Sequence, residues 1–201
     1  MPLQNRVTPF GQVAALPGRG LMMGNRGVLH DDHRRILRAW QVRRWIACVL
    51  EFRGRYRAVM QPHRYTELFF LDEAAAFAAG HRPCAECRRA DYDRFRAIWN
   101  AVRGGNDGAD AMDLALHRAR LDGRAKRTYR AELAELPDGA YVALEGGAWL
   151  VWRDALHRWS DAGYVERRVR PNRLAVEVLT PQPVVAVLTA GYTPAVHPSA
   201  Q

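Results

Sequence analysis

Two cysteines, Cys84 and Cys87, stand two residues apart in a turn that runs from Gly80 to Cys87. Thiolate sulfur is a preferred zinc ligand, and two thiolates at this spacing converge on one ion from a tight turn. Pro83 stiffens the approach, and a helix expected directly after Cys87 favours thiolate at its N-terminus. The pattern therefore predicts half of a tetrahedral zinc site, with two further ligands supplied by other parts of the chain.

The other ligands are sought among the remaining cysteine and histidine side chains. His63 lies in a break just before an aromatic run, a natural place for a ligand. Cys48 lies among apolar residues, so ligand duty and burial as a small hydrophobic side chain are both open. His81 fits either a ligand or a hydrogen-bond partner of one. We expect a zinc site built from Cys84, Cys87, His63 and Cys48, with His30 and His33 as more distant candidates.

The Cys84 and Cys87 pair has two other readings, a redox-active dithiol and a pair of inert thiols. A redox motif of this spacing belongs to a βαβ pattern, and this one does not follow a strand in such a pattern. Metal binding is therefore the favoured interpretation of the pair.

A second polar cluster, at residues 30–33, is His30-Asp31-Asp32-His33, directly after a glycine-rich stretch. Such groups serve metal-dependent hydrolysis of phosphodiesters, in which a metal activates water. The same residues also suit the start of a helix over 33–41, where aspartate is favoured by capping and by the helix dipole. Further along, Asp113 and His117 stand one helical turn apart and are expected to pair.

The charge balance favours a polyanionic partner. The chain has 30 Lys and Arg against 21 Asp and Glu, a net charge of +9, and Lys126 is its only lysine. An excess of this kind attracts phosphate, although an arginine-rich composition also arises from a GC-rich genome. Tyr56 and Tyr65 are candidates for base stacking. The residues expected to contact nucleic acid, DNA more than RNA, are Arg53, Arg55, Arg57, Arg82, Arg88, Arg89, Lys126 and Arg127.

The pattern of apolar residues predicts an α+β fold. A helix is expected over 73–79, capped by Asp72 and ended by Gly80, with further helices over 90–102, 110–120 and 128–134. Strands are expected over 44–52 and 55–60 as a hairpin, and over 65–71. The later strands are expected over 141–145 and 148–152, joined at Gly146-Gly147, and over 174–179 and 184–188.

We therefore expect a small mixed sheet with central helices around the zinc-binding turn, followed by a C-terminal β-rich region. Residues 1–137 form the first region, with a glycine-rich N-terminal extension, and residues 138–201 form the second, packed on the same core. The odd number of cysteines does not suit a secreted disulfide framework, and neither a signal peptide nor a membrane span is expected. A cytoplasmic location follows from these features.

The segment Leu68–Arg88 resembles the zinc-binding domain of Ada-type DNA repair proteins, with a looser likeness over 44–89. In that family a strand ending in Phe-Phe leads into an alanine-rich helix and then into Gly-aromatic-Arg-Pro-Cys-x-x-Cys-Arg. Here the corresponding residues are Phe69-Phe70, the helix at 73–79, and Gly80-His81-Arg82-Pro83-Cys84-Ala85-Glu86-Cys87-Arg88. The resemblance implies a zinc site with four cysteine ligands on a DNA-binding module.

The sequence departs from this family just before the Phe-Phe strand. The family has two more cysteines there, one of which accepts a methyl group from DNA phosphotriesters. This chain has Val59-Met60-Gln61-Pro62-His63 instead, so His63 fills one ligand role and methyl transfer is not expected.

The leading hypothesis is thus a zinc-stabilised nucleic-acid-binding protein with a link to DNA repair. The alternatives are a metal-dependent nuclease that uses residues 30–33, and a metal-stabilised protein-interaction module.

Overall fold

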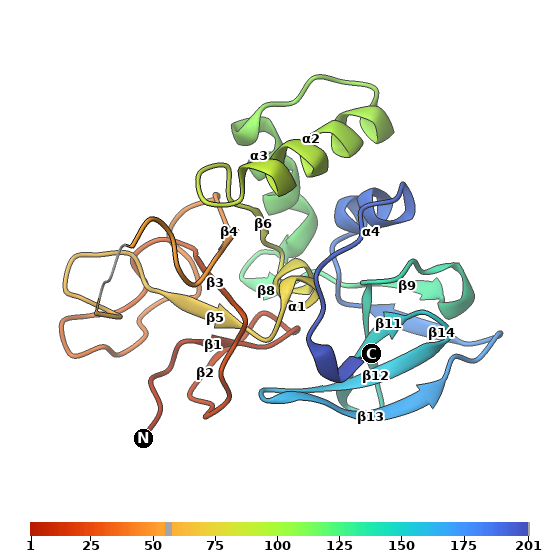
Figure 1. The fold of residues 1–201 in the computed structure, drawn as a ribbon, viewed down its shortest axis with the longest axis horizontal. Coiled ribbons are helices and arrows are strands. Elements are labelled where there is room, and N and C mark those ends of the chain that lie inside the picture. The colour runs from red at the N-terminus through yellow and green to blue at the C-terminus, as the bar shows by residue number, and fades with distance from the viewer. Residues whose placement is uncertain (55–57, 201) are drawn as a thin grey trace.

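The computed structural model describes residues 1–54 and 58–200 and confirms a mixed α+β fold (Figure 1). Its first sheet is mixed and has the strand order β2-β1-β5-β3-β4-β6. Two of its pairings, β1 with β5 and β4 with β6, are parallel, and the others are antiparallel. The strands are β1 (Arg6–Val7), β2 (Val13–Ala14), β3 (Met22–Asn25), β4 (Ile46–Cys48), β5 (Leu68–Phe70) and β6 (Arg82–Pro83).

The second sheet is antiparallel throughout and has the order β13-β12-β11-β10-β14-β9. Its predicted hairpin is confirmed, with Glu145 and Gly146 in the left-handed conformation that a tight two-residue turn requires. The strands are β9 (Tyr129–Glu132), β10 (Tyr141–Leu144), β11 (Gly147–Trp152), β12 (Ala155–Ser160), β13 (Gly163–Val169) and β14 (Ala175–Val178). The sheet thus takes one strand, β9, from before residue 138; the division into two regions at that residue stays a prediction. A small hairpin, β7 (Leu121–Asp122) with β8 (Ala125–Lys126), is separate.

Helix α1 (Glu73–Ala78) lies between the two sheets (Figure 1), and all six of its residues are buried. Ala74, Ala75 and Ala78 pack with residues of the second sheet, whereas Ala76 packs with the first. Alanine suits this helix because only small side chains let both sheets approach it closely. The predicted cap is confirmed, since the Asp72 carboxylate accepts a hydrogen bond from the amide of Ala75 at 2.8 Å.

The other helices pack together on Phe77 of α1. They are α2 (Arg89–Arg103), α3 (Ala109–Arg120) and α4 (Gln182–Thr189). The first two are close to the predicted helices. The predicted strand at 184–188 is wrong, because it lies in α4. A continuous apolar run reads equally as a buried strand or a buried helix, and a proline in the first turn, Pro183, suits a helix start.

Two predicted helices of the N-terminal half and the middle are also wrong, and one predicted strand is confirmed only in part. Residues 33–41 form turns and an isolated bridge from His30 to Ile36, with no helix. The strand expected over 44–52 shrinks to β4, and its expected hairpin partner falls in part on residues 55–57, outside the described residues. Residues 129–132 form β9, where a helix was expected, before a short 3₁₀ turn at Leu133–Glu135.

Two acidic residues at the start of α1 fasten the C-terminal segment to the core. Asp72 accepts hydrogen bonds from the Tyr164 hydroxyl at 2.6 Å and from the amide of His197 at 2.9 Å. Glu73 accepts from the Tyr192 hydroxyl at 2.8 Å and the amide of Ala195 at 2.9 Å. The chain end is therefore tied to the same helix that leads into the cysteine turn. Within the described ranges, no helix has both the length and the apolar character needed to span a lipid bilayer.

Candidate metal centre

The parallel pairing of β4 with β6 brings Cys48 to the cysteine turn. Ile46 stands beside Arg82 and Ala47 beside Pro83, and the amide of Cys84 donates to the Ala47 carbonyl at 2.9 Å. Cys48 is the last residue of β4, and Cys84 directly follows β6. The register of the two strands therefore places these two cysteines side by side. Two sulfur ligands that are 36 positions apart in the sequence thus meet at the ends of adjacent strands.

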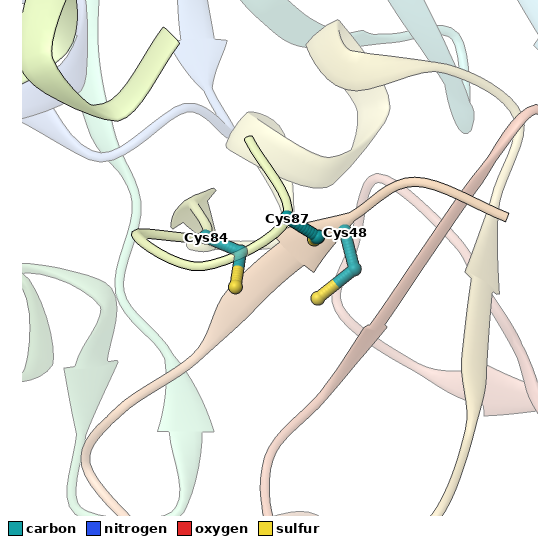
Figure 2. Close-up of side chains that lie close together, drawn as sticks. All are labelled: Cys48, Cys84 and Cys87. Carbon is teal, nitrogen blue, oxygen red and sulfur yellow. The ribbon is translucent and has the colours of Figure 1, made fainter. Parts of the chain in front are cut away.

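The turn after β6 supplies the third thiol. The amide of Arg88 donates to the Cys84 carbonyl at 3.1 Å, and the amide of Glu86 donates to the Cys84 sulfur at 3.4 Å. This closed turn carries Cys87 back toward the two strands, as Figure 2 shows. The three sulfur atoms, Cys48 Sγ, Cys84 Sγ and Cys87 Sγ, lie within 4.8 Å of one another.

This donor set fits a thiophilic ion. A zinc ion with Zn–S bonds of about 2.3 Å in a tetrahedral arrangement holds its sulfurs about 3.8 Å apart. The observed group is within a small side-chain adjustment of that spacing. Three cysteines of this chain can therefore bind one metal ion, and in the described ranges no fourth cysteine, histidine or carboxylate belongs to the same group.

Hydrogen bonds among the thiols shift their pKa values in opposite directions. A hydrogen bond from the Cys48 thiol lowers the pKa of Cys84 to about 5, and the same donor lowers the pKa of Cys87. The donor role raises the pKa of Cys48, with hydrogen bonding to Cys84 as the largest cause. These shifts move Cys84 and Cys87 toward the thiolate, the form that binds metal.

The three cysteines line a cleft of about 460 Å³ on one face of the first sheet. Alternate residues of each strand form that face: Met23 and Asn25 of β3, Ile46 and Cys48 of β4, and Phe69 of β5. The intervening residues, among them Met22, Ala47, Leu68 and Phe70, face the core beside α1. The sheet thus separates the helix from a cleft that leads to the sulfurs.

Glu67 is a cleft residue that the sequence analysis missed. It is buried, and its carboxylate accepts a hydrogen bond from the amide of Met60 at 2.7 Å. Tyr65, Glu67 and Phe69 all line the cleft, so they show the period of two that marks one face of a strand. That alternation was available in the sequence. Glu86 and the exposed Arg44 also line the cleft.

The structure does not bring His63 to the cysteines. Its side chain is 89% exposed, and its Nε2 lies 4.0 Å from a carboxylate oxygen of Asp32. The loop that carries it follows Met60, which is fully buried, and both Met60 and His63 have a left-handed backbone conformation. The expected ligand is therefore corrected: Cys48, and not His63, joins the pair.

His81 is also absent from the thiol group. It is fully buried against the rings of Phe70 and Trp45, with ring centroids 4.5 and 5.4 Å away. Burial lowers its pKa well below the usual range, and its Nε2 accepts a hydrogen bond from Arg26 at 3.3 Å. The His81 side chain thus belongs to a separate cluster with Arg26 and Trp45.

The polar residues 30–33 are committed to the loop that they form. His30 is buried, with Nδ1 2.6 Å from the Thr66 hydroxyl and Nε2 3.2 Å from the Gln61 carbonyl. The Asp31 carboxylate accepts from the amides of His33 and Arg35 and pairs with the Arg35 side chain. These partners give His30 and Asp31 a structural role, and the hydrolytic role of residues 30–33 stays a hypothesis.

Two arginines beside the cysteines are internal and do not offer a surface for nucleic acid. Arg82 is 1% exposed and donates two hydrogen bonds of 2.8 Å to Asp113. Arg88 is 8% exposed and pairs with Glu73 at 2.7 Å and with Asp91 at 2.7 Å. The expected pair of Asp113 with His117 is also corrected, since His117 Nδ1 lies 3.1 Å from the Arg120 guanidinium.

The other expected contact residues have mixed positions. Arg53, Arg89 and Arg127 are exposed; Arg89 pairs with Asp93, and Arg127 with Asp122 at 3.6 Å. Lys126 is partly buried and donates to the Ala78 carbonyl. Arg55, Arg57 and Tyr56 lie outside the described residues.

Comparison with known proteins does not add to this geometry. No protein-family model, no curated protein and no solved structure matches the chain.

Proposed function

We propose that this protein is a zinc protein that binds nucleic acid at the cleft beside its three cysteines. The observation that carries the proposal is the meeting of Cys48, Cys84 and Cys87 at the ends of two adjacent strands, with their sulfurs within 4.8 Å. Zinc is the ion of choice because cysteine-rich sites of this kind select it in a reducing compartment.

The lining of the cleft supports a nucleic-acid ligand. Phe52, Tyr65 and Phe69 provide aromatic rings of the kind on which bases stack, and Arg44 provides a cation for phosphate. Arg53 and Arg89 are exposed near the ends of the segments that carry Cys48 and Cys87. The net charge of +9 adds a long-range attraction for a polyanion.

The likeness to Ada-type zinc domains points in the same direction. It covers the Phe-Phe strand, the alanine-rich helix and the cysteine turn, and it implies a DNA ligand. The chain supplies three cysteines where that family has four, so the repair link is proposed only at the level of DNA binding.

The composition of the cleft favours one second candidate, a zinc-dependent hydrolase that acts on nucleic acid. Sites with three protein ligands are typical of catalytic zinc, which lowers the pKa of a bound water. Glu67 and Glu86 line the same cleft as the sulfurs, and a carboxylate in that position is suited to accept a proton from water.

One experiment addresses both candidates. Zinc-loaded protein is titrated against labelled single-stranded and double-stranded DNA and RNA of one sequence, at several salt concentrations. We expect binding whose logarithm falls linearly with the logarithm of salt, because phosphate contacts release counterions. Arg44→Gln should weaken binding about fivefold, the effect of losing one contact worth about 1 kcal/mol. Cys84→Ser should lose both zinc and binding.

Arg173→Gln is the matched control, since it removes the same charge at an exposed position outside the cleft. Equal losses in the two arginine variants would locate binding elsewhere, and no binding to any probe would overturn the proposal. The same samples are assayed for cleavage. Turnover that is lost in Glu67→Gln, with zinc and binding retained, selects the hydrolase; binding without turnover selects the binding protein.

A further inference from the structure

A second cavity, of about 700 Å³, shares no lining residue with the cysteine cleft. Its walls are the segment 10–13, the loop 36–40 and the region 120–128 around the β7–β8 hairpin. Volumes of this size are typical of pockets for small organic ligands. The proposed function does not use this cavity.

The cavity has two buried arginines in its lining. Arg26 and Arg120 both line the cavity and are each 1% exposed. Their guanidinium groups lie 4.1 and 3.8 Å from the ring centroid of Trp45, which is buried with them. Gly80 makes room for one of them, because a Cβ at that residue would lie 2.6 Å from the Arg120 Cδ.

The hydrogen bonds of these arginines leave donors unused. Arg26 donates through Nε to His81 and through Nη1 to the Gly11 carbonyl at 3.0 Å. Arg120 donates through Nη1 to the Gly80 carbonyl at 2.8 Å and through Nη2 to the Arg43 carbonyl. Arg26 Nη2, Arg120 Nε and His81 Nδ1 have no hydrogen-bond partner among the described residues, although each is buried. A buried charged donor without a partner is costly, so an unpartnered pair of guanidinium donors beside one cavity indicates a missing acceptor.

A third cation, Lys126, lines the same cavity, and the exposed Arg38 and Arg124 line it as well. The charges of Arg26 and Arg120 add to burial in lowering the pKa of Lys126 to about 7. Burial likewise lowers the pKa of Arg26 to about 9 and of Arg120 to about 8. Lowered pKa values of this kind are expected for buried cations that lie close together without a nearby negative charge.

The carboxylates of the region do not supply that counter-charge. Asp113 attracts Arg120 but gives both of its oxygens to Arg82. Glu177 is the acidic residue among the described lining residues, and it is exposed and accepts a hydrogen bond from the Thr128 hydroxyl at 2.6 Å. Arg26, Arg120 and Lys126 therefore form a concentration of positive charge in the lining of the cavity.

We propose that this cavity binds a phosphomonoester, with its phosphate held by Arg26, Arg120 and Lys126 and its organic part against Phe10 and Trp40. A phosphomonoester is preferred to a carboxylate because its two charges and several acceptor oxygens match three cations. The phosphate belongs either to a free small molecule such as a mononucleotide or to the 5′ end of a nucleic acid strand.

Calorimetry on the full chain at constant ionic strength tests this proposal with four probes: inorganic phosphate, AMP, a 5′-phosphorylated oligonucleotide and the same oligonucleotide with a 5′ hydroxyl. We expect saturable binding of phosphorylated probes. Lys126→Gln should weaken it about tenfold, the effect of one charge-assisted hydrogen bond. Arg124→Gln, at an exposed lining position, gives a second variant should Lys126→Gln fail to fold.

Arg127→Gln is the matched control, because Arg127 is the neighbouring cation and does not line the cavity. Its side chain donates to the Leu121 carbonyl and pairs with Asp122. Binding of AMP assigns a free phosphomonoester. In Cys84→Ser, which lacks binding at the cleft, binding of the 5′-phosphorylated strand without binding of AMP assigns a strand end. The proposal is overturned if no phosphorylated probe binds, or if Arg127→Gln weakens binding as much as the lining variants do. It is also overturned if the 5′-hydroxyl strand binds as tightly as the phosphorylated strand to Cys84→Ser, in which binding at the cysteine cleft is lost. Loss of zinc in Cys84→Ser should leave phosphate binding in place, so this test is independent of the metal centre.

Discussion

At the scale of single residues, burial decides what the charged side chains do. Arg82 and Arg88 flank the cysteines in the sequence, and their spacing suggested a surface that clamps phosphate. The structure instead pairs them with Asp113 and Glu73 inside the fold. Sequence spacing cannot distinguish the two roles, because the acidic partners come from positions 31 and 15 residues away.

The pair of Arg88 with Glu73 links the cysteine turn to α1 and gives a stability prediction. Glu73→Gln removes the buried counter-charge of Arg88 and leaves it only the partly exposed Asp91. The new amide NH₂ must face either the Ala195 N–H or the Arg88 guanidinium. We expect the free energy of unfolding to fall by about 3 kcal/mol, as for other broken buried pairs. Urea denaturation followed by circular dichroism measures it.

Asp93→Asn provides the control, because Asp93 pairs with the exposed Arg89. Its expected cost is much smaller than that of Glu73→Gln, because solvent screens the exposed pair. Equal costs for the two variants would show that the buried pair does not fasten the turn to the helix.

At the scale of elements, local patterns predicted what local physics controls. The cap at Asp72, the alanine-rich helix and the Gly146 hairpin all follow from interactions within a few residues, and each is confirmed. The apolar run at 184–188 was misassigned because burial on all sides erases the periodicity that separates helix from strand. The alternation of Tyr65, Glu67 and Phe69 indicated one face of a strand. It could not show that the cysteines lie on that face, because this depends on which strands pair with it.

The position of α1 between two sheets gives a packing prediction. Ala75 is fully buried against the second sheet, so Ala75→Leu forces extra volume into a filled layer. We expect a loss of stability of about 1–3 kcal/mol. Thermal and urea denaturation of the purified variant measure it.

Ala101→Leu makes the same change at an exposed position of α2, where it should alter stability by less than about 0.5 kcal/mol. If Ala75→Leu is tolerated equally well, the helix does not lie in a tightly filled layer.

At the scale of the whole molecule, α1 lies between two sheets, and the three cysteines that could bind a metal lie at one edge of the first sheet. The sequence identified Cys84 and Cys87 from their spacing and kept Cys48 as a candidate. It could not select Cys48 over His63, because that choice depends on the parallel register of β4 with β6, a long-range pairing. The net charge was read as a surface property, yet Arg26 and Arg120 place part of it in the interior.

The most direct measurement is zinc analysis combined with X-ray absorption at the zinc edge, on protein purified under reducing conditions. We predict one zinc per chain, bound by three sulfurs at about 2.3 Å and one lighter atom. In Cys48→Ser the sulfur count should fall to two. Protein without bound metal, or a sulfur count unchanged by Cys48→Ser, would contradict a site built from Cys48, Cys84 and Cys87.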